Sequence, residues 1–262
     1  MKKIFTLWLT ILMLAAFMVG CSTADEPIRN ADADTVRDEL LQHTDADITA
    51  DDDGDDVYEG DASSYYIDEV YAAQIERYYT ALSEKWDEGK YFENEMSALP
   101  YYYYEGNPLE NVGFSFVDLD NDGHLELIIG AILNNDKDPA VFEIWTVVDG
   151  KPVMLAQGGS RNRYVLKYVE EDGMWYVVNE GSNNAASHVT YYLMLQDGKL
   201  EIVQGVLFDA TVDAQNPWYL TYDMDWDVSN DEPINEETAN AILDANRQHY
   251  TAPEYFPYIY YR

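Results

Sequence analysis

The chain has 262 residues, and 50 acidic residues against 15 basic ones give it a formal net charge of −35. A surface of this charge repels nucleic acid and anionic lipid headgroups at long range, so neither is expected as an electrostatic partner. Aromatic residues make up 14% of the chain, with 23 tyrosines among them, which argues against disorder over most of the length. The single cysteine, Cys21, excludes a disulfide within the chain.

Residues 1–20 have the composition of a signal peptide. Two lysines follow Met1, residues 4–19 are almost all apolar, and small Gly20 directly precedes Cys21. The segment Met-Val-Gly-Cys resembles a lipobox, which implies diacylation at Cys21, and two acyl chains suffice for stable anchoring. We therefore predict a lipoprotein anchored at Cys21 on the extracytoplasmic face of the cell membrane. A plain signal peptide or an uncleaved anchor is the alternative, but it leaves a lone secreted cysteine unexplained.

Residues 21–61 are rich in Asp and Ala and poor in aromatic residues. Such a segment buries too little apolar surface to offset its ordering entropy. We predict an acidic, disordered tether between the lipid and a single domain over residues 62–262. The acids of residues 51–56 do not alternate, and no strand pattern follows them, so we interpret them as a solvated run rather than a metal site.

The predicted domain begins with a helix. Ser63 or Ser64 is a candidate N-cap, and Gly89 is a candidate stop. One face collects apolar residues at helical spacing. These residues are Ile67, Tyr71, Ile75, Tyr78, Leu82 and Trp86. We interpret this tyrosine-rich stripe as a core face rather than a sugar-binding platform. A second, short helix is expected within residues 91–99, before Pro100.

Residues 114–130, FSFVDLDNDGHLELIIG, have the composition of a calcium loop. Asp118, Asp120 and Asp122 alternate, and Gly123 follows where a sharp turn favours positive φ. Calcium takes oxygen ligands from carboxylates, carbonyls and water. Four carboxylates within nine residues repel one another without a cation, which disfavours the alternative of a solvated polar turn. Magnesium is disfavoured because it keeps its waters and rarely uses an all-protein cage.

The loop departs from an EF-hand. Position twelve holds Ile129 instead of a bidentate glutamate, and the flanking residues indicate strands rather than helices. The pattern Asp-x-Asp-x-Asp-Gly-x-x-acid between strands resembles the calcium loops of FG-GAP and VCBS repeats, and the single such loop of many bacterial surface lipoproteins. The resemblance covers about residues 114–130 and implies a metal site, not a fold. The ligands it implies are Asp118, Asp120, Asp122, the backbone carbonyl of His124, and Glu126 as the closing carboxylate.

Strand patterns joined by Asp-Gly turns dominate the middle of the chain. The three pairs of predicted strands are 141–148 with 153–155, 163–169 with 175–178, and 188–195 with 200–208. Asp-Gly between alternating apolar runs is a strong hairpin signal. Together with the two strands around the calcium loop, they predict an antiparallel meander of about eight strands, and residues 218–222 are a further predicted strand. The calcium motif does not repeat, so a full propeller is not expected.

The last part of the chain holds a second acidic alternation and a helix. Asp223, Asp225 and Asp227 alternate, but Val228 stands where the loop needs glycine. We therefore favour an edge strand with an acidic outer face over a second metal site. Asn235 is the expected N-cap of a helix over residues 236–250. Its predicted inward residues are Ala239, Ile242, Leu243 and Tyr250. The fold class predicted is α+β, with the meander packed against an N-terminal and a C-terminal helix.

No motif of nucleophilic, phosphate-binding or zinc chemistry is present in the sequence. We expect residues 179–188, NEGSNNAASH, to form a long polar loop, and such loops on a rigid sheet often bind ligands. The candidate ligand-binding residues are Glu180, Asn183, Asn184 and His188; an ordinary connector is the alternative. Three basic residues alternate on one predicted strand face: Arg161, Arg163 and Lys167. They either hold an anionic ligand or pair with surplus carboxylates.

These features predict a membrane-anchored lipoprotein with a structural calcium site, acting as a binding or interaction module for a glycan or an envelope protein. The alternative is a secreted, glycosidase-like hydrolase that uses a pair of carboxylates. Sequence spacing alone does not identify such a pair among the 50 acids. A third interpretation is a structural or inhibitory partner of another protein. We favour a protein without catalytic activity.

Overall fold

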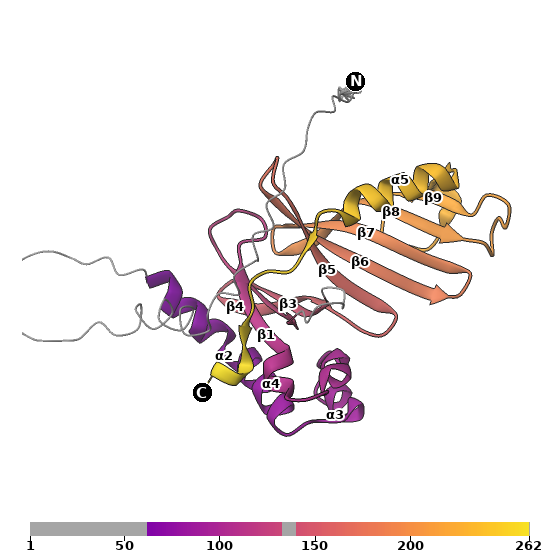
Figure 1. Cartoon of the computed structure of the whole chain (residues 1–262). Coiled ribbons are helices and arrows are strands. Elements are labelled where there is room, and N and C mark those ends of the chain that lie inside the picture. The colour runs from indigo at the N-terminus through magenta and orange to yellow at the C-terminus, as the bar shows by residue number, and fades with distance from the viewer. Residues whose placement is uncertain (1–61, 133–139, 262) are drawn as a thin grey trace, which may run out of the picture. The chain divides into compact units, whose positions relative to one another are not determined.

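The computed structural model of the chain describes residues 62–132 and 140–261, with side chains from residue 69 onward (Figure 1). The predicted signal peptide, the lipidation site at Cys21 and the acidic tether lie outside the described residues. Four α-helices and twelve strands form in the described part, so the predicted α+β class is confirmed. None of the described helices is long and apolar enough to cross a membrane.

Of the helical segments in the described residues, four precede the first strand and three lie near the C-terminus. They are α2 (Ala62–Ser83), α3 (Glu88–Glu93), η1 (Leu99–Tyr103), α4 (Pro108–Asn111), η2 (Val228–Asn230), α5 (Glu236–Arg247) and η3 (Tyr258–Tyr260). The N-terminal and C-terminal helices predicted from the sequence are α2 and α5.

All twelve strands belong to one antiparallel sheet, as expected of a meander. They are β1 (Val112–Val117), β2 (Glu126–Ala131), β3 (Val141–Val148), β4 (Lys151–Gln157), β5 (Asn162–Val169), β6 (Met174–Asn184), β7 (Ser187–Gln196), β8 (Lys199–Asp209), β9 (Trp218–Thr221), β10 (Glu232–Ile234), β11 (Tyr250–Thr251) and β12 (Phe256–Pro257). The predicted number of about eight strands is too low. The last three strands have only two or three residues each, and such short strands leave no alternation to recognise.

The sheet consists of two meanders joined at β3. Its hydrogen-bonded order is β10-β9-β8-β7-β6-β5-β3-β2-β1-β12, with β4 on β3 and β11 on β5. Strand β3 pairs with β2 and β4, and a single register pair, Val141 with Tyr164, connects it to β5. Strands β1–β4 therefore form one meander and β5–β10 a second.

Two of the three Asp-Gly hairpins have the predicted turn. Asp149 and Gly150 have φ of 52° and 71°, and Asp197 and Gly198 have φ of 50° and 72°. Positive φ at both positions is the type I′ geometry that Asp-Gly favours. At the third hairpin only Gly173 has positive φ, 66°, and its N–H donates to the carbonyl of Val169 across a longer turn.

Helix α2 packs on the first meander through the face that its spacing predicts. Tyr71, Ile75, Tyr78 and Leu82 are buried. They share one apolar cluster with strand residues Val112, Phe114, Leu127, Ile129, Phe142 and Trp145. Burial of this face, at about 25 cal/mol per Å² of apolar surface, is what holds the helix on the sheet.

The ends of the first helices differ from the prediction. Helix α2 already includes Ser63 and ends at Ser83, and Gly89 lies inside α3. The short helix expected at residues 91–99 begins earlier, because Asp87 caps it by accepting a hydrogen bond from the N–H of Lys90. Residues 99–103 form the 3-10 turn η1 instead.

Helix α5 covers one face of the second meander (Figure 1). The side chain of Asn235, directly before the helix, accepts a hydrogen bond from the N–H of Thr238, which confirms the predicted N-cap. Ala239 and Leu243 are buried against Val206 of β8. The helix ends at Arg247, so the predicted end at residue 250 is wrong, and Tyr250 lies in β11. The opposite face of β5–β9 contributes to a core cluster that also includes Ile128 and Ile144 of the first meander.

The segment 179–188 is not a long loop. Strand β6 runs to Asn184 and β7 begins at Ser187, so only residues 185 and 186 connect them. The polar side chains that indicated a loop belong to paired strands. Asn179, for example, is buried and donates to the side-chain oxygen of Asn162 and to the carbonyl of Arg163. Hydrogen bonds of this kind let a polar sequence form a strand.

Candidate metal centre

The candidate metal centre lies in the connection between β1 and β2. Val117 and Glu126 form the last register pair of the two strands, and the loop between them comprises residues 118–125. The flanking strands predicted from the sequence are confirmed. Leu119 is buried in a core cluster that both meanders share, and this burial fixes the start of the loop.

The carboxylate of Asp118 shapes the loop. Its two oxygens accept hydrogen bonds from the backbone N–H groups of Asp122 and Gly123, each at 3.1 Å. Asn121 and Gly123 have φ of 60° and 86°. Asn and Gly are the residues that tolerate this left-handed conformation best. The loop therefore turns back on itself, and Asp118 and Asp120 come close to Glu126.

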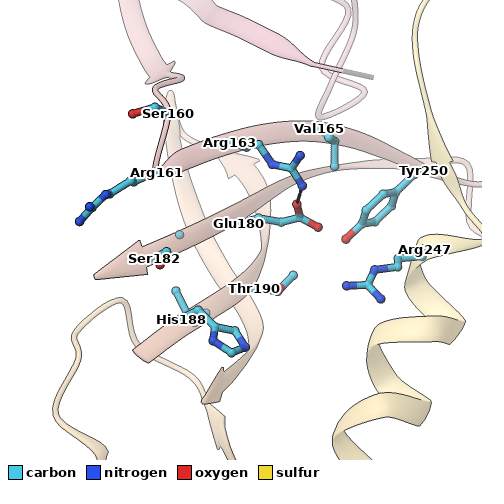
Figure 2. A pocket seen from close by; sticks show the side chains of 12 residues that line it. Ser160, Arg161, Arg163, Val165, Glu180, Ser182, His188, Thr190, Arg247 and Tyr250 are labelled. Atoms are coloured by element: carbon cyan, nitrogen blue, oxygen red, sulfur yellow. Dashed lines mark hydrogen bonds and ion pairs between the residues drawn. The ribbon is translucent and has the colours of Figure 1, made fainter. Parts of the chain in front are cut away.

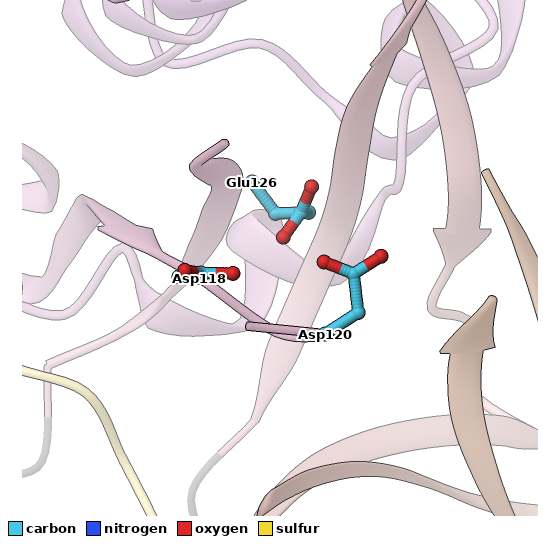
Figure 3. Close-up of side chains that lie close together, drawn as sticks. All are labelled: Asp118, Asp120 and Glu126. Carbon is cyan, nitrogen blue, oxygen red and sulfur yellow. The ribbon is translucent and has the colours of Figure 1, made fainter. Parts of the chain in front are cut away.

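Three carboxylates converge inside this turn: Asp118, Asp120 and Glu126 (Figure 3). Each offers an oxygen within 4.8 Å of the other two. Glu126 is only 2% exposed. In the part of the chain that the structure describes, these are the only three acidic, histidine or cysteine side chains grouped this closely.

The buried glutamate is held by two hydrogen bonds. Its Oε2 accepts from the N–H of Leu119 and its Oε1 from the hydroxyl of Thr146 on β3, both at 2.9 Å. The pKa of Glu126 is raised to about 7, chiefly by burial and to a smaller extent by the charges of Asp120 and Asp122, while the two hydrogen bonds oppose the shift. Sequence reasoning missed Thr146, whose only signal is a hydroxyl in a strand that is apolar apart from Glu143.

Asp120 has no compensating partner for one of its oxygens. Its Oδ1 is buried and accepts no hydrogen bond. Desolvation, and after it the charge of Asp122, raise the pKa of Asp120 above its ordinary value. A buried carboxylate oxygen without a donor is costly. A cation bound between Asp118, Asp120 and Glu126 would remove that cost.

The structure brings together three of the five predicted ligands. The carboxylate of Asp122 is not part of the group, and its Oδ1 accepts a hydrogen bond from the N–H of His124 at 2.7 Å. The backbone carbonyl of His124 and the carboxylate of Asp122 stay predicted ligands. The three grouped carboxylates supply hard oxygen donors, which suit calcium, magnesium or manganese.

Hydrogen bonds connect the loop to distant elements. The hydroxyl of Tyr71 on α2 donates to the carbonyl of Leu125 at 3.1 Å. The side chain of Asn121 donates to the carbonyl of Gly173 in the β5–β6 turn at 3.1 Å. The loop thus contacts the N-terminal helix and both meanders, so its order affects the whole domain.

The second acidic alternation has a different local structure. Strand β9 ends at Thr221, so the predicted edge strand does not include the acids. Asp223, Asp225 and Asp227 each accept a hydrogen bond from the N–H two residues further on. This is the Asx-turn geometry of a connector.

The predicted ligand-binding residues fall into two groups. Glu180 and His188 line a cavity of about 580 Å³ beside α5 (Figure 2). Asn183 and Asn184 lie at the β6–β7 turn outside its lining, where the Asn184 side chain accepts from the N–H of Ala186. Of the alternating cations, Arg163 pairs with Glu180 and Lys167 donates to the side chain of Asn246 at 2.7 Å. Pairing with a carboxylate is thus confirmed for Arg163.

Comparisons with protein families, with curated proteins and with solved structures found no match to this chain.

Proposed function

We propose that the protein is a calcium-stabilised binding module that a lipid at Cys21 holds on the extracytoplasmic face of the cell membrane. The observation that carries the calcium part is the convergence of Asp118 and Asp120 on the buried Glu126 in one turn. The lipid part rests on the N-terminal sequence, and the binding role rests on the pocket beside α5 and on the absence of a catalytic motif from the sequence.

Calcium suits the site better than the smaller magnesium ion. The candidate donors are carboxylates of one short loop with a buried glutamate behind them, and the backbone carbonyl of His124 and waters complete the shell. Calcium accepts such mixed, flexible oxygen sets, whereas magnesium demands near-octahedral geometry and retains several waters. The resemblance of residues 114–130 to FG-GAP and VCBS loops points to the same ion.

The role proposed for the ion is structural. It neutralises three carboxylates at the point where Tyr71 of α2 and Asn121 connect the loop to distant parts of the fold. Because the sequence contains no pair of cysteines, a metal takes the place of a disulfide as a cross-link in an oxidising compartment.

Thermal unfolding of the full chain in detergent tests the proposal. We expect the melting temperature to rise in excess calcium relative to chelator, and to rise less in magnesium. Calcium at a hundredfold excess over its dissociation constant adds about 2.7 kcal/mol if it binds only the folded state. An unchanged melting temperature would overturn the proposal.

The rival function, a glycosidase-like hydrolase, predicts turnover. A panel of saccharides, assayed for both binding and released reducing ends, separates the two. Binding without release supports the module. Release that disappears on replacement of a carboxylate pair supports the hydrolase.

A further inference from the structure

The cavity beside α5 lies where one face of the second meander loses its cover. Under the helix this face is apolar, and Val165 and Val178 form a cross-strand pair there. One row further along the strands, the same face carries Arg163, Glu180 and Thr190 in register. Helix α5 ends beside this row at Arg247. The polar row is therefore the floor of a recess whose wall is the end of the helix.

Side chains from both elements face into this recess. Figure 2 shows Arg247 and Tyr250 on one side, opposite Glu180 and Thr190 on the sheet, while Arg161 points away from the centre. The cavity measures about 580 Å³, within the range of roughly 300–1,000 Å³ typical of small-molecule sites.

The recess gathers positive charge in a very acidic protein. Three of the four arginines in the described residues line it, against one acidic residue, Glu180. Glu180 pairs with Arg163, and its side chain is 19% exposed. Arg247 contacts Asp244 of its own helix at 3.6 Å, and both side chains are more than half exposed. Exposed pairs of this kind contribute little, so the Arg247 guanidinium is available to a ligand.

A ligand of this recess needs both an anionic group and hydrogen-bond donors. The arginines favour a carboxylate, which a guanidinium binds in a bidentate manner. The carboxylate of Glu180 repels a purely anionic ligand but accepts hydrogen bonds from hydroxyl groups. The hydroxyls of Thr190 and Ser182 also line the recess.

An aromatic row adjoins the polar row on the same face. His188 lines the recess and stacks on Phe208 with ring centroids 4.6 Å apart, and Phe208 contacts Trp218 edge-on at 4.8 Å. The imidazole of His188 is exposed at the rim. A flat aromatic surface beside hydroxyl and charged groups suits a sugar ring, which has an apolar face and a polar edge.

We propose that this recess binds a sugar that carries a carboxylate, a uronic acid unit. Arg247 and Arg163 bind its carboxylate, Glu180 and Thr190 bind its hydroxyls, and His188 contacts the ring. The inference rests on the proposed binding function and names the ligand class of that module.

Isothermal titration calorimetry on the full chain in detergent and calcium tests this inference. The probes are D-glucuronate, the uncharged D-glucose, inorganic phosphate and glycine. We expect D-glucuronate to bind at least about tenfold more tightly than each of the other three, because they lack the carboxylate or the hydroxyls. No binding of D-glucuronate, or equal binding of phosphate, glycine or D-glucose, overturns the proposal.

Two variants assign the binding to the recess. Arg247→Gln removes an exposed guanidinium and should weaken D-glucuronate binding about tenfold or more, the expected effect of a charged hydrogen bond. Thr190→Val replaces the hydroxyl on the sheet floor and should weaken it less. Lys151→Gln removes one positive charge on β4, outside the recess, and should leave the affinity unchanged. Equal affinity of wild type and Arg247→Gln overturns the proposal, provided that both unfold at the same temperature.

The calcium and sugar experiments fail separately. A calcium-dependent rise in melting temperature without D-glucuronate binding overturns only the sugar assignment. D-Glucuronate binding without a calcium-dependent rise supports the sugar assignment and contradicts the calcium site.

Discussion

The carboxylate of Glu126 accepts a hydrogen bond from the backbone N–H of Leu119, with 2.9 Å between Oε2 and N. The two residues stand at opposite ends of the acidic loop, so this bond closes the loop across its base. Leu119 is 2% exposed, and its buried side chain fixes the position of the donor. The loop is therefore pre-organised for a cation, because little ordering remains to be done on binding.

Replacement of Asp120 should remove the calcium response. Asp120→Ala deletes the carboxylate whose Oδ1 is buried without a hydrogen-bond partner. We expect the melting temperature of this variant in calcium to lie near that of the wild type in chelator. Asp225→Ala deletes an exposed acid elsewhere and should respond to calcium like the wild type. A full calcium response in Asp120→Ala would show that this residue is not a ligand.

Asp122 distinguishes the ligand set implied by the sequence from the group found in the structure. The amide oxygen of Asp122→Asn can still accept the hydrogen bond from the N–H of His124. In calorimetric titrations, we expect Asp122→Asn to bind calcium at least about tenfold more tightly than Asp120→Asn does. Equal losses would mean that the carboxylate of Asp122 binds the ion, as the resemblance implies.

The stability of the protein in chelator should fall as the pH rises. Burial raises the pKa of Glu126 from 4.5 to about 7, so the folded state binds a proton more tightly than the unfolded state. The contribution is complete below about pH 4.5 and is lost as the pH rises to about 7, roughly 3 kcal/mol in all. Urea unfolding across this range measures the free energy of unfolding.

Glu126→Gln provides the control for this pH dependence. The variant cannot ionise at this position, so its free energy of unfolding in chelator should vary less between pH 4.5 and 7. It should also bind calcium more weakly than the wild type. An unchanged pH dependence would place the ionisation on another group.

Gly113 should not tolerate a methyl group. A Cβ at this position would lie 2.8 Å from the carbonyl oxygen of Phe256 and 2.8 Å from the Cβ of Tyr255. Gly113→Ala should therefore lower the free energy of unfolding by about 1–3 kcal/mol. At Gly159 a Cβ would meet no atom within 4 Å, so Gly159→Ala should leave the free energy of unfolding unchanged or slightly higher. Equal effects would contradict the pairing of β1 with β12.

The N-cap of α5 should contribute measurably to stability. Asn235→Ala removes the acceptor of the Thr238 N–H, 2.8 Å away, and should cost about 1 kcal/mol. Asn240→Ala, an exposed position of the same helix, should cost nothing, because alanine is the better helix former. The difference in urea midpoint between the two variants measures the cap. The absence of a difference would contradict it.

Local patterns predicted most of the longer elements. The helical spacing of Tyr71, Ile75 and Tyr78 identified the buried face of α2, since the spacing is a property of the helix itself. Asp149-Gly150 identified a hairpin, because few other residue pairs adopt positive φ twice. Strands of two or three residues escaped prediction, and polar strands at residues 179–188 were mistaken for a loop, because tertiary pairing outweighs local preference there.

The acids at Asp118 and Asp120 could be assigned to a loop closed by Glu126 from the amino-acid order alone, because ligand spacing within a few residues is set by the chain. The support of Glu126 by Thr146, a residue of another strand, depends on the folded arrangement. The meeting of Arg163 and Arg247 in one recess depends on it as well. Residues this far apart in sequence meet through strand register and helix packing, which no local pattern encodes.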